Sequence, residues 1–544
     1  MSDQQRPITG LSTMLDAGSL RKPDMLIESL DPLLGLPASA APVRLSLIEL
    51  AAYVNNVAAN LKLRLGTTAD RPRVLILREN SLECNLLAIA VAKCEGLPLL
   101  VNSKAWDNAG DALVRKFSPH YVVGDEKMFP VESGAAAAFY GNLYCADYPI
   151  SQEVEPDFTE VTGSIHHYPV LCTHTSGTTG DPKIVVHSDH SMLVNQARTE
   201  SLRWAFWAGK KRDKYLSAVS FSHVRSLVWL NSQMRNKIQA IATTGRVSGK
   251  GLLEAARAVQ PTMVEAIPSG FQEAESMMAP DEWAFNRVRY FMNTFDAIHS
   301  RTVKGLLKQT KVSFAIWGQG WAQSEVGPLA ITFYVKAGRV ARVPRKFIGI
   351  AAPGVHFSEA EVSRGGGATE AHSGTASVAS ERVALPGRGH RLLLAKSGGR
   401  ALGYFDDARL TRGTYLNEGW WSTNDVGRVI GGRGVILDGR AEDYVEGIGS
   451  VIEFESEVLE RVPILVEAVL VDLGADEGDI KPILVASRRS TSRSNDEDLY
   501  RELKRVLPPA VRVAVVPYEQ LPLTGTGKVR RAALREIVKA TMEG

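Results

Sequence analysis

Thr175-Ser-Gly-Thr-Thr-Gly-Asp-Pro-Lys183 is the stretch of sequence that decides the fold of this chain. Its glycines let backbone N–H groups turn toward an anion, while hydroxyl side chains and a final lysine add hydrogen bonds and positive charge. Apolar runs on both sides, Tyr168–Cys172 and Ile184–His187, predict that the segment joins two strands. We therefore expect a loop that holds a triphosphate. Its candidate phosphate-binding residues are Thr175, Ser176, Gly177, Thr178, Thr179, Gly180 and Lys183.

Two other interpretations of this loop can be compared with its sequence. The Walker A loop of kinases and GTPases needs adjacent Gly and Lys, followed by a helix. Here Asp181-Pro182 separates Gly180 from Lys183 and an apolar strand follows, which excludes that class. An ordinary polar turn is the remaining alternative. A run of nine residues with this composition, ending in Pro-Lys, disfavours it.

Length and charge bound the class of protein. A chain of 544 residues is too long for one hydrophobic core, so we expect two to four domains or subdomains. The 63 basic and 60 acidic residues leave a formal charge of +3. This near balance gives no electrostatic footprint for nucleic acid or for an anionic membrane, so neither is expected as a partner.

The cysteines and the apolar segments indicate a reduced compartment. Cys84, Cys94, Cys145 and Cys172 are scattered, without a Cys-x-x-Cys pair or a zinc spacing. The N-terminus lacks an apolar signal core. The apolar run 86–93 is short and ends in a charge, which is typical of a buried helix and not of a membrane span. We therefore expect a cytoplasmic protein.

The order of the expected elements is typical of an α/β protein. A strand-like run at 73–77 and a helix-like run at 81–95 begin an alternation that returns at 262–267. Such alternation predicts parallel sheets covered by helices. Between about 340 and 438 the texture changes to short strands separated by Gly-rich turns. The charged segment 439–443 then precedes a final region that we expect to be a small α+β domain after a hinge.

The C-terminal segment Leu521-Pro-Leu-Thr-Gly-Thr-Gly-Lys-Val-Arg530 is the second informative motif. Proline and paired glycines fix a loop that presents one lysine, which would ordinarily be a solvated charge. This segment and the Thr175–Lys183 loop resemble the signatures of the adenylate-forming superfamily. That superfamily includes acyl- and aryl-CoA synthetases, the adenylation domains of peptide synthetases, and firefly luciferase. Its pattern Pro-x-Thr-x-x-Gly-Lys-x-x-Arg is kept at Pro522, Thr524, Gly527, Lys528 and Arg531.

The resemblance implies both a fold and a reaction. It implies a large N-terminal domain, residues 1–440, of two doubly wound sheets plus a small β-barrel-like subdomain. A small mobile α+β domain, residues 441–544, would carry Lys528. In the family that lysine stabilises charge between the carboxylate and the α-phosphate. The implied reaction is attack of a carboxylate oxygen on the α-phosphorus of ATP, with Mg²⁺ as cofactor and pyrophosphate as leaving group.

Trp317–Glu325 resembles a nucleotide-binding element of the same family, aromatic-Gly-x-Thr-Glu. It follows an apolar run, which places it at the carboxyl edge of a strand, where open α/β sheets bind ligands. By resemblance, Trp321 stacks near adenine and Ser324 contacts the phosphate. Glu325 is the implied magnesium ligand, together with Thr178 of the first loop.

Trp421–Asp425, expected in a turn before a strand, resembles the Thr-Gly-Asp element of the family, with Asn424 in place of Gly. A carboxylate at this position can accept hydrogen bonds from both ribose hydroxyls. The resemblance therefore implies that Asp425 binds the ribose. Arg440 is the matching second contact to ribose and phosphate.

Two segments with weaker sequence signals concern the part of the site that would bind the acid. His223 aligns with an aromatic-His pair beside the family's acyl pocket, although a lone histidine is more often simply hydrogen-bonded within the fold. Arg225 lies close by in sequence and indicates a polar or anionic part of the substrate. Asn293–Ala297 replaces a Gly-Gly-Ala-like run, and Phe295 and Asp296 there would fill space and add charge. We expect a small or polar carboxylic acid.

Three functions remain open from the sequence. The first is a ligase that transfers the activated acyl group to CoA, or to the phosphopantetheine of a separate carrier protein. The second passes the group to an amine or another nitrogen nucleophile without CoA. The third is a nucleotide-binding protein without turnover, against which Lys528 and Glu325 speak. Glu446 stands where a Lys is common in relatives, and Ile184 where they usually have Gly, so the acceptor stays open. The sequence does not determine the oligomeric state.

Overall fold

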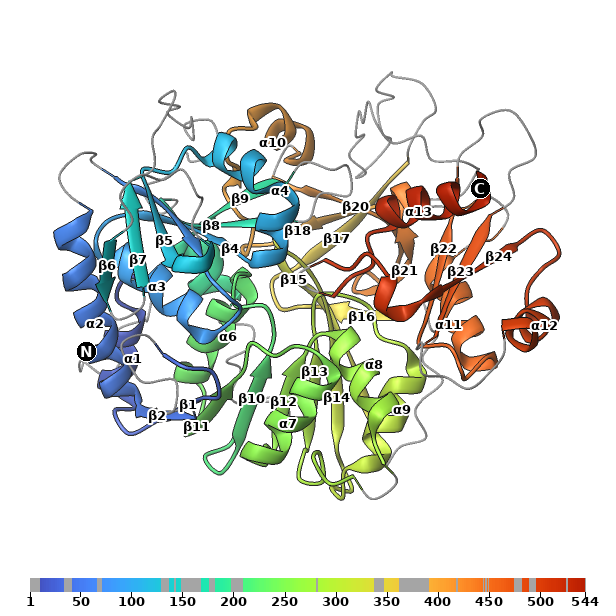
Figure 1. The fold of residues 1–544 in the computed structure, drawn as a ribbon, viewed down its shortest axis with the longest axis horizontal. Coiled ribbons are helices and arrows are strands. Elements are labelled where there is room, and N and C mark those ends of the chain that lie inside the picture. The colour runs from blue at the N-terminus through green and yellow to red at the C-terminus, as the bar shows by residue number, and fades with distance from the viewer. Residues whose placement is uncertain are drawn as a thin grey trace.

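The computed structural model describes most of the chain (Figure 1). The described residues are 10–33, 42–65, 71–128, 137–140, 143–147, 168–175, 182–196, 209–279, 282–336, 347–361, 391–416, 419–443, 445, 448, 450–473, 482–488, 496–524 and 527–543. They form two large sheets and a small third sheet, with helices on the sheet faces. This is the α/β architecture that the sequence predicts. Residues 176–181 of the first loop lie outside the described part.

The eight-stranded sheet is mainly parallel at its centre and antiparallel at both ends. Its central strands are apolar and buried, as expected for a sheet covered on both faces. In spatial order it contains β19 (Gly403–Tyr404), β9 (Lys183–Ser188), β8 (Pro169–Thr175), β4 (Leu97–Val101), β3 (Arg73–Leu77), β5 (Tyr121–Asp125), β7 (Leu143–Asp147) and β6 (Ala137–Tyr140). The antiparallel pairing of β8 with β9 confirms that the first loop joins two strands.

The thirteen-stranded sheet has a parallel part and a long antiparallel extension. The parallel part is β14 (Ile316–Gln323), β13 (Tyr290–Asn293), β12 (Met263–Ala266), β10 (Lys214–Ala218), β11 (Ala240–Thr243) and β1 (Leu26–Ser29), edged by the antiparallel β2 (Val43–Ser46). The extension is β15 (Gly327–Val335), β16 (Phe347–Ala351), β21 (Gly434–Arg440), β20 (Trp421–Ile430), β18 (Arg391–Lys396) and β17 (His356–Glu361). Apart from β19, the strands described between 340 and 438 therefore continue the larger sheet.

Helices fill the space between the two large sheets and cover their outer faces (Figure 1). One apolar cluster joins side chains of both sheets to α2 (Leu47–Arg64), α3 (Leu82–Lys93) and α6 (Val224–Arg235). A second cluster packs α7 (Gly249–Val259), α8 (Pro268–Met277) and α9 (Ser300–Gln309) on the larger sheet. The residues described before 440 also include the helices α1 (Met14–Arg21), α4 (Ser103–Phe117) and α10 (Ala408–Thr414). Among the described residues, no helix combines the length and apolarity needed to cross a membrane.

Two local predictions around the nucleotide motifs are wrong in detail. The apolar run 312–316, expected to be a strand that ends before the glycine-rich motif, is a strand only at its last residue. Ser313 and Phe314 form a turn, and β14 begins at Ile316 and runs through the motif. The small residues there pair with both β13 and β15, which extends the strand. Trp421–Asp425 lies within β20, not in a turn. Asn424 has a φ of 55°, so a left-handed residue is accommodated inside an irregular strand.

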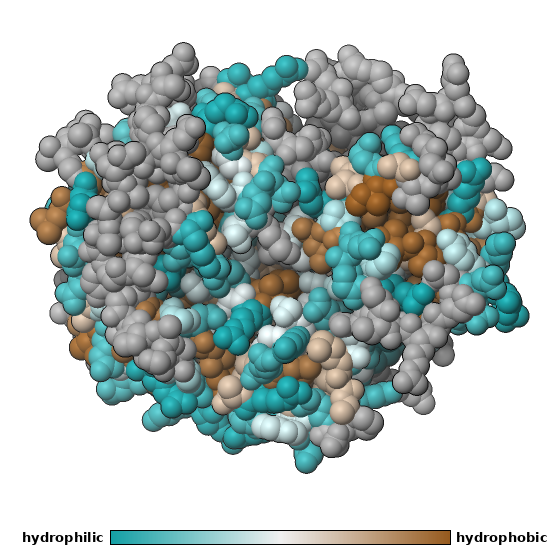
Figure 2. Space-filling view, in the orientation of Figure 1, coloured by the Kyte–Doolittle hydropathy of each residue, from teal (hydrophilic) through white to brown (hydrophobic). Residues whose placement is uncertain are grey.

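The C-terminal region forms the small α+β unit that the sequence predicts. Its sheet is β22 (Glu467–Val471), β23 (Ile483–Arg488) and β24 (Arg512–Pro517), and its helices are α11 (Val451–Arg461), α12 (Asp496–Val506) and α13 (Arg531–Glu543). Two apolar clusters lie almost wholly within this unit. Figure 2 shows that hydrophilic side chains predominate on one face of the molecule, with an apolar patch over this unit. The exact boundary at residue 440 stays a prediction.

Candidate functional site

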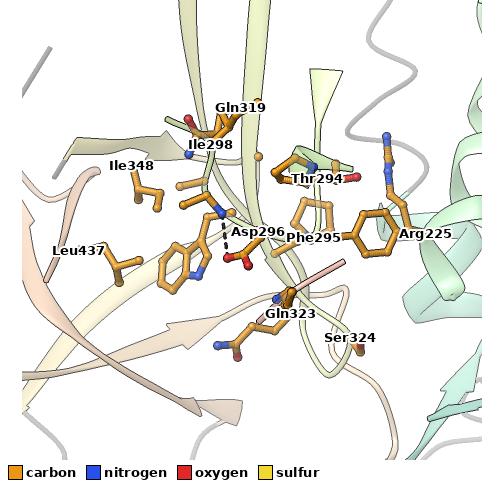
Figure 3. A pocket seen from close by; sticks show the side chains of 18 of the residues that line it. Arg225, Thr294, Phe295, Asp296, Ile298, Gln319, Gln323, Ser324, Ile348 and Leu437 are labelled. Atoms are coloured by element: carbon orange, nitrogen blue, oxygen red, sulfur yellow. Dashed lines mark hydrogen bonds between the residues drawn. The ribbon is translucent and has the colours of Figure 1, made fainter. Parts of the chain in front are cut away.

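One cavity of about 1240 Å³ brings together the candidate residues that the structure describes. The cavity lies where the carboxyl ends of the parallel strands of the larger sheet meet its antiparallel extension and the C-terminal unit. Figure 3 shows part of its lining. The predicted site residues on its wall are Thr175, Lys183, His223, Arg225, Asp296, Trp321, Ser324, Glu325, Asp425, Arg440 and Lys528. The predicted contacts of Ser176, Gly177, Thr178, Thr179 and Gly180 fall outside the described residues.

Lys183, Tyr404 and Glu325 lie close together beside the strand ends that flank the first loop. Thr175 and Lys183 are cross-strand partners of β8 and β9, so they stand at the two ends of the loop. The Lys183 Nζ lies 5.7 Å from the centre of the Tyr404 ring. The Tyr404 hydroxyl donates to Oε1 of Glu325 at 3.0 Å. Burial and the Glu325 charge raise the pKa of Tyr404 well above its usual value, so the phenol stays a neutral donor.

The donor set at Glu325 fits one kind of metal site. Among the described residues, no group of three His, Cys, Asp or Glu side chains could hold an ion by itself. A single carboxylate on the wall of a nucleotide-sized cavity suits Mg²⁺, which keeps several waters and takes its remaining ligands from substrate phosphates. Glu325 is therefore a chemically suitable ligand for magnesium carried by ATP.

An acidic and a basic side chain, Asp425 and Arg440, face each other on the cavity wall. Asp425 of β20 and Arg440 of β21 are register partners, and Oδ1 of Asp425 lies 3.2 Å from Nε of Arg440. Gln323 donates to Oδ2 of Asp425 at 2.9 Å and to the Thr423 carbonyl at 2.8 Å. Burial raises the pKa of Asp425, and the charges of Arg440 and Lys528 oppose this effect. The carboxylate is thus held in one orientation by its neighbours, as a ribose contact requires.

Trp321 is an aromatic residue of the cavity wall beside Asp425. Its indole stacks on Phe357, with ring centres 5.7 Å apart and an interplanar angle of 14°. Ile348 and Leu437 belong to the same apolar cluster. One face of the indole is therefore already covered, while the residue also lines the cavity. The stacking of Trp321 near adenine stays a prediction.

His223 is fixed as a neutral hydrogen-bond donor. It is the N-cap of α6, where its Nδ1 accepts from the Arg225 N–H at 3.1 Å. Its Nε2 therefore carries the proton and donates to Oγ of Ser324 at 2.8 Å. Burial, with smaller effects from His187 and Lys528, lowers the pKa of His223 to about 3. His223 therefore hydrogen-bonds to Ser324, the predicted phosphate contact, and itself belongs to the predicted acyl pocket.

Phe295 occupies a backbone conformation that its residue type disfavours. Its φ is 80°, and an aromatic residue in the left-handed region costs about 1–3 kcal/mol. Its ring meets the His223 ring edge-on, with ring centres 4.9 Å apart. Figure 3 shows Phe295 and Asp296 on the loop beside Thr294, with the Asp296 carboxylate turned back to accept from the Ala297 N–H at 2.9 Å. Despite this strain, the Phe295 ring lies against His223 and takes up space in the cavity.

Arg225 has a carboxylate partner within the protein. Its Nε and Nη2 donate to the two oxygens of Glu265, at 2.7 and 2.6 Å. Glu265 lies in β12, is fully buried, and also accepts from Thr294 Oγ1 at 3.0 Å and from the Tyr215 hydroxyl at 3.4 Å. The charge of Arg225 is therefore matched by Glu265, and the wall it forms is polar without net charge. This revises the inference from Arg225 toward an anionic substrate.

The C-terminal loop places Lys528 at the cavity. The Lys528 N–H donates to Thr524 Oγ1 at 3.0 Å, and Gly527 adopts a φ of 77°. A Cβ on Gly527 would lie 2.2 Å from Oγ of Ser269, at the start of α8, so the loop packs directly on the large domain. The Lys528 charge opposes the rise in the pKa of Asp425 that burial causes, and it adds to the fall in the pKa of His223. Lys528 therefore lies near enough to both residues to act on their charge.

Three residues of this site were not identified from the sequence. Tyr404 carries no motif and reaches Glu325 only because β19 pairs with β9. Gln323 was noted only as part of a motif, although it holds Asp425. Glu265 is a charge in the middle of an otherwise apolar strand, a signal that could have identified it.

The comparisons with known proteins agree with this geometry. The family model of AMP-binding enzymes matches residues 36–380. The chain is 28% identical to 3-amino-2-hydroxy-4-methoxybenzoate diazotase of Streptomyces cremeus, over 69% of this chain and 64% of that protein. The match thus spans slightly under two thirds of that relative. The chain is also 24% identical to 3-aminoavenalumate diazotase of a Streptomyces species, over 92% of this chain and 90% of that relative.

Solved structures show the same fold. The anthranilate CoA ligase AuaEII, in complex with anthranoyl-AMP, superimposes with a TM-score of 0.73 and 16% identity, covering 100% of both chains. The family match extends over more than half of this chain. It confirms the family resemblance, and the matched residues include the motif at 175–183 but end before the motif at 521–531. The protein belongs to the family of AMP-binding enzymes.

Proposed function

We propose that this protein is an AMP-forming ligase that activates a small acid with ATP and passes the activated group to a nitrogen nucleophile. The observation that carries the first step is the distribution of charge around one cavity. Lys183, Glu325, Asp425 and Arg440 all line it. The Lys528 charge acts on Asp425 and on His223. These charges suit a nucleotide with its triphosphate toward the first loop and its ribose at Asp425.

The activation step needs positioning and charge neutralisation, and no protein nucleophile. An oxygen of the acid attacks the α-phosphorus of ATP, and pyrophosphate leaves. Lys528 stabilises the negative charge that develops on the α-phosphate. Lys183, with magnesium held by Glu325, would neutralise the leaving pyrophosphate. His223 contributes as a donor through Nε2, because its Nδ1 is occupied by the Arg225 N–H.

The residues around the predicted acid-binding part of the cavity favour a small acid that lies next to polar groups. The ring of Phe295 rests against His223 and takes space that a glycine would leave open. The Arg225–Glu265 pair forms a polar wall nearby, supported by Thr294. Such a wall suits amino or hydroxyl groups of a co-substrate better than an alkyl chain.

The names of two relatives support a nitrogen acceptor. Both are diazotases, and a diazotase gives an amine a second nitrogen atom. Nitrite is a small oxyanion that can supply this atom by the same chemistry as a carboxylate. Its oxygen would attack the α-phosphorus of ATP and release pyrophosphate, which gives nitrosyl-AMP. An aryl amine would then attack the nitrosyl nitrogen, with AMP leaving and one amine proton released. The second N–H proton would move to the nitroso oxygen, and uptake of the released proton there would let water leave and give the aryl diazonium group. Transfer to CoA or to a carrier thiol, the first expectation from the sequence, is the alternative.

Pyrophosphate release distinguishes these functions. The purified protein is incubated with ATP, Mg²⁺ and either nitrite or a panel of small carboxylic acids, each with an aminobenzoate or with CoA. We expect AMP and pyrophosphate to form together with an amine-derived product. A thioester product would contradict the nitrogen acceptor, and no pyrophosphate with any acid would contradict the ligase.

A further inference from the structure

One arginine of the large domain binds the end of a helix in the C-terminal unit. Arg301, in the first turn of α9, donates from Nη1 to the carbonyls of Leu459 and Pro463, at 3.2 and 3.0 Å. Its Nη2 donates to the carbonyl of Leu465 at 2.8 Å. These carbonyls lie at the C-terminal end of α11 and in the turn that follows. Helix C-termini leave carbonyls without intrahelical partners and carry partial negative charge, so a guanidinium suits them.

Two weaker contacts flank Arg301. His299 Nε2 lies 3.3 Å from Oε1 of Glu467, and Lys304 Nζ lies 3.7 Å from Oε1 of Glu460. The Lys304 side chain is about half exposed, so solvent screens its pair. Arg301 makes hydrogen bonds to three backbone groups in a fixed fork, which gives it the larger part in placing α11.

The same placement of the C-terminal unit brings Lys528 to the cavity. The loop before Lys528 touches Ser269 in the first turn of α8, and α8 packs beside α9. We propose that Arg301 is a positioning residue that holds the C-terminal unit with Lys528 in the site, and so favours activation of the acid over a state with Lys528 withdrawn. This inference rests on the proposed function. Arg301 acts on the reaction through Lys528 and not by touching the substrate.

A double-mutant cycle tests this role. Exchange of labelled pyrophosphate into ATP is measured with the acid that proves active, for Arg301→Ala, Arg301→Lys, Lys528→Ala and the double variant Arg301→Ala with Lys528→Ala. Lys308→Ala is the matched control, because Lys308 is an exposed cation on the same helix. We expect Arg301→Ala to lower the exchange rate about tenfold at unchanged KM for ATP, Arg301→Lys to fall between, and Lys308→Ala to match the parent.

The decisive comparison is in the Lys528→Ala background. Arg301→Ala should cause no further loss there, because the lysine it positions is absent. Equal losses in both backgrounds, or an Arg301→Ala protein as active as the parent, would overturn the inference. Small-angle scattering of the nucleotide-free proteins gives a second readout that does not need turnover. Arg301→Ala should increase the average dimensions relative to Lys308→Ala, and unchanged dimensions count against the inference even if no acid supports exchange and the proposed function fails.

Discussion

The hydroxyl of Tyr404 donates a hydrogen bond of 3.0 Å to the carboxylate of Glu325, and Lys183 lies over the same phenol ring. This arrangement joins β9, β19 and the turn between β14 and β15, which are far apart in sequence. It fixes the orientation of the one carboxylate that we assign to magnesium. Groups that orient a metal ligand are themselves important for affinity.

Removing this hydroxyl should weaken the metal site without unfolding the protein. Tyr404→Phe keeps the ring beside Lys183 and deletes only the donor to Glu325. We expect the Mg²⁺ concentration for half-maximal exchange to rise about 10-fold to 100-fold. A titration of Mg²⁺ at saturating ATP measures this. Tyr415→Phe, which deletes a hydroxyl bonded to the Ala401 carbonyl, is a control for loss of a buried tyrosine hydroxyl; an equal shift in both variants would contradict the assignment.

Phe295 should limit the size of the acid. In Phe295→Gly, relief of about 1–3 kcal/mol of backbone strain opposes the loss of about 2 kcal/mol of apolar burial, so stability should change little. The variant should favour bulkier acids, raising their kcat/KM relative to the smallest acid about tenfold or more. Phe295→Leu, which keeps bulk at the same backbone angle, should retain the preference of the parent. The same preference in the glycine variant would exclude this role.

The Arg225–Glu265 pair should behave as a buried ion pair. Arg225→Leu leaves the fully buried Glu265 without its cation and should destabilise by about 3–5 kcal/mol. Replacing both residues by leucine removes the uncompensated charge and should cost less than the single change. Urea unfolding followed by tryptophan fluorescence compares the two variants. A double variant that is less stable than Arg225→Leu would contradict this account.

Buried histidines should make the fold less stable in mild acid. Burial lowers the pKa of His187 to about 3 and that of His174 to about 4, from an ordinary value of 6.5. Between these values and 6.5 the unfolded chain binds protons that the folded chain does not, so the free energy of unfolding falls as pH falls below 6.5. His187→Gln should reduce this slope in urea unfolding between pH 7 and pH 5. A slope as steep in His187→Gln as in the parent would contradict this account.

The sequence predicts the elements well where a local pattern determines them. The apolar run 73–77 matches β3, and the helix-like run 81–95 contains α3. The motif residues Lys183, Glu325, Asp425 and Lys528 could be assigned to one site because their order along the chain is that of a known family. The structure then brings them to a single cavity.

What the sequence leaves out depends on pairings between distant segments. Tyr404 reaches Glu325 because a two-residue strand pairs with β9, more than two hundred residues earlier. Arg225 meets Glu265 across neighbouring elements, which changes its meaning from a substrate contact to an internal ion pair. Trp421–Asp425 has polar, turn-like residues, yet its hydrogen bonds to β18 and β21 make it a strand. Local composition contains none of these contacts.

The central claim is that Lys528 and the cavity around it activate an acid as an adenylate. Acid-dependent exchange of labelled pyrophosphate into ATP tests this most directly, comparing the parent with Lys528→Ala and with Lys504→Ala, an exposed cation of α12 in the same C-terminal unit. We predict exchange with a small acid, a loss of about 100-fold or more in Lys528→Ala, and near-parental exchange in Lys504→Ala. Exchange that persists without Lys528, or none with any acid in the parent, would contradict the account.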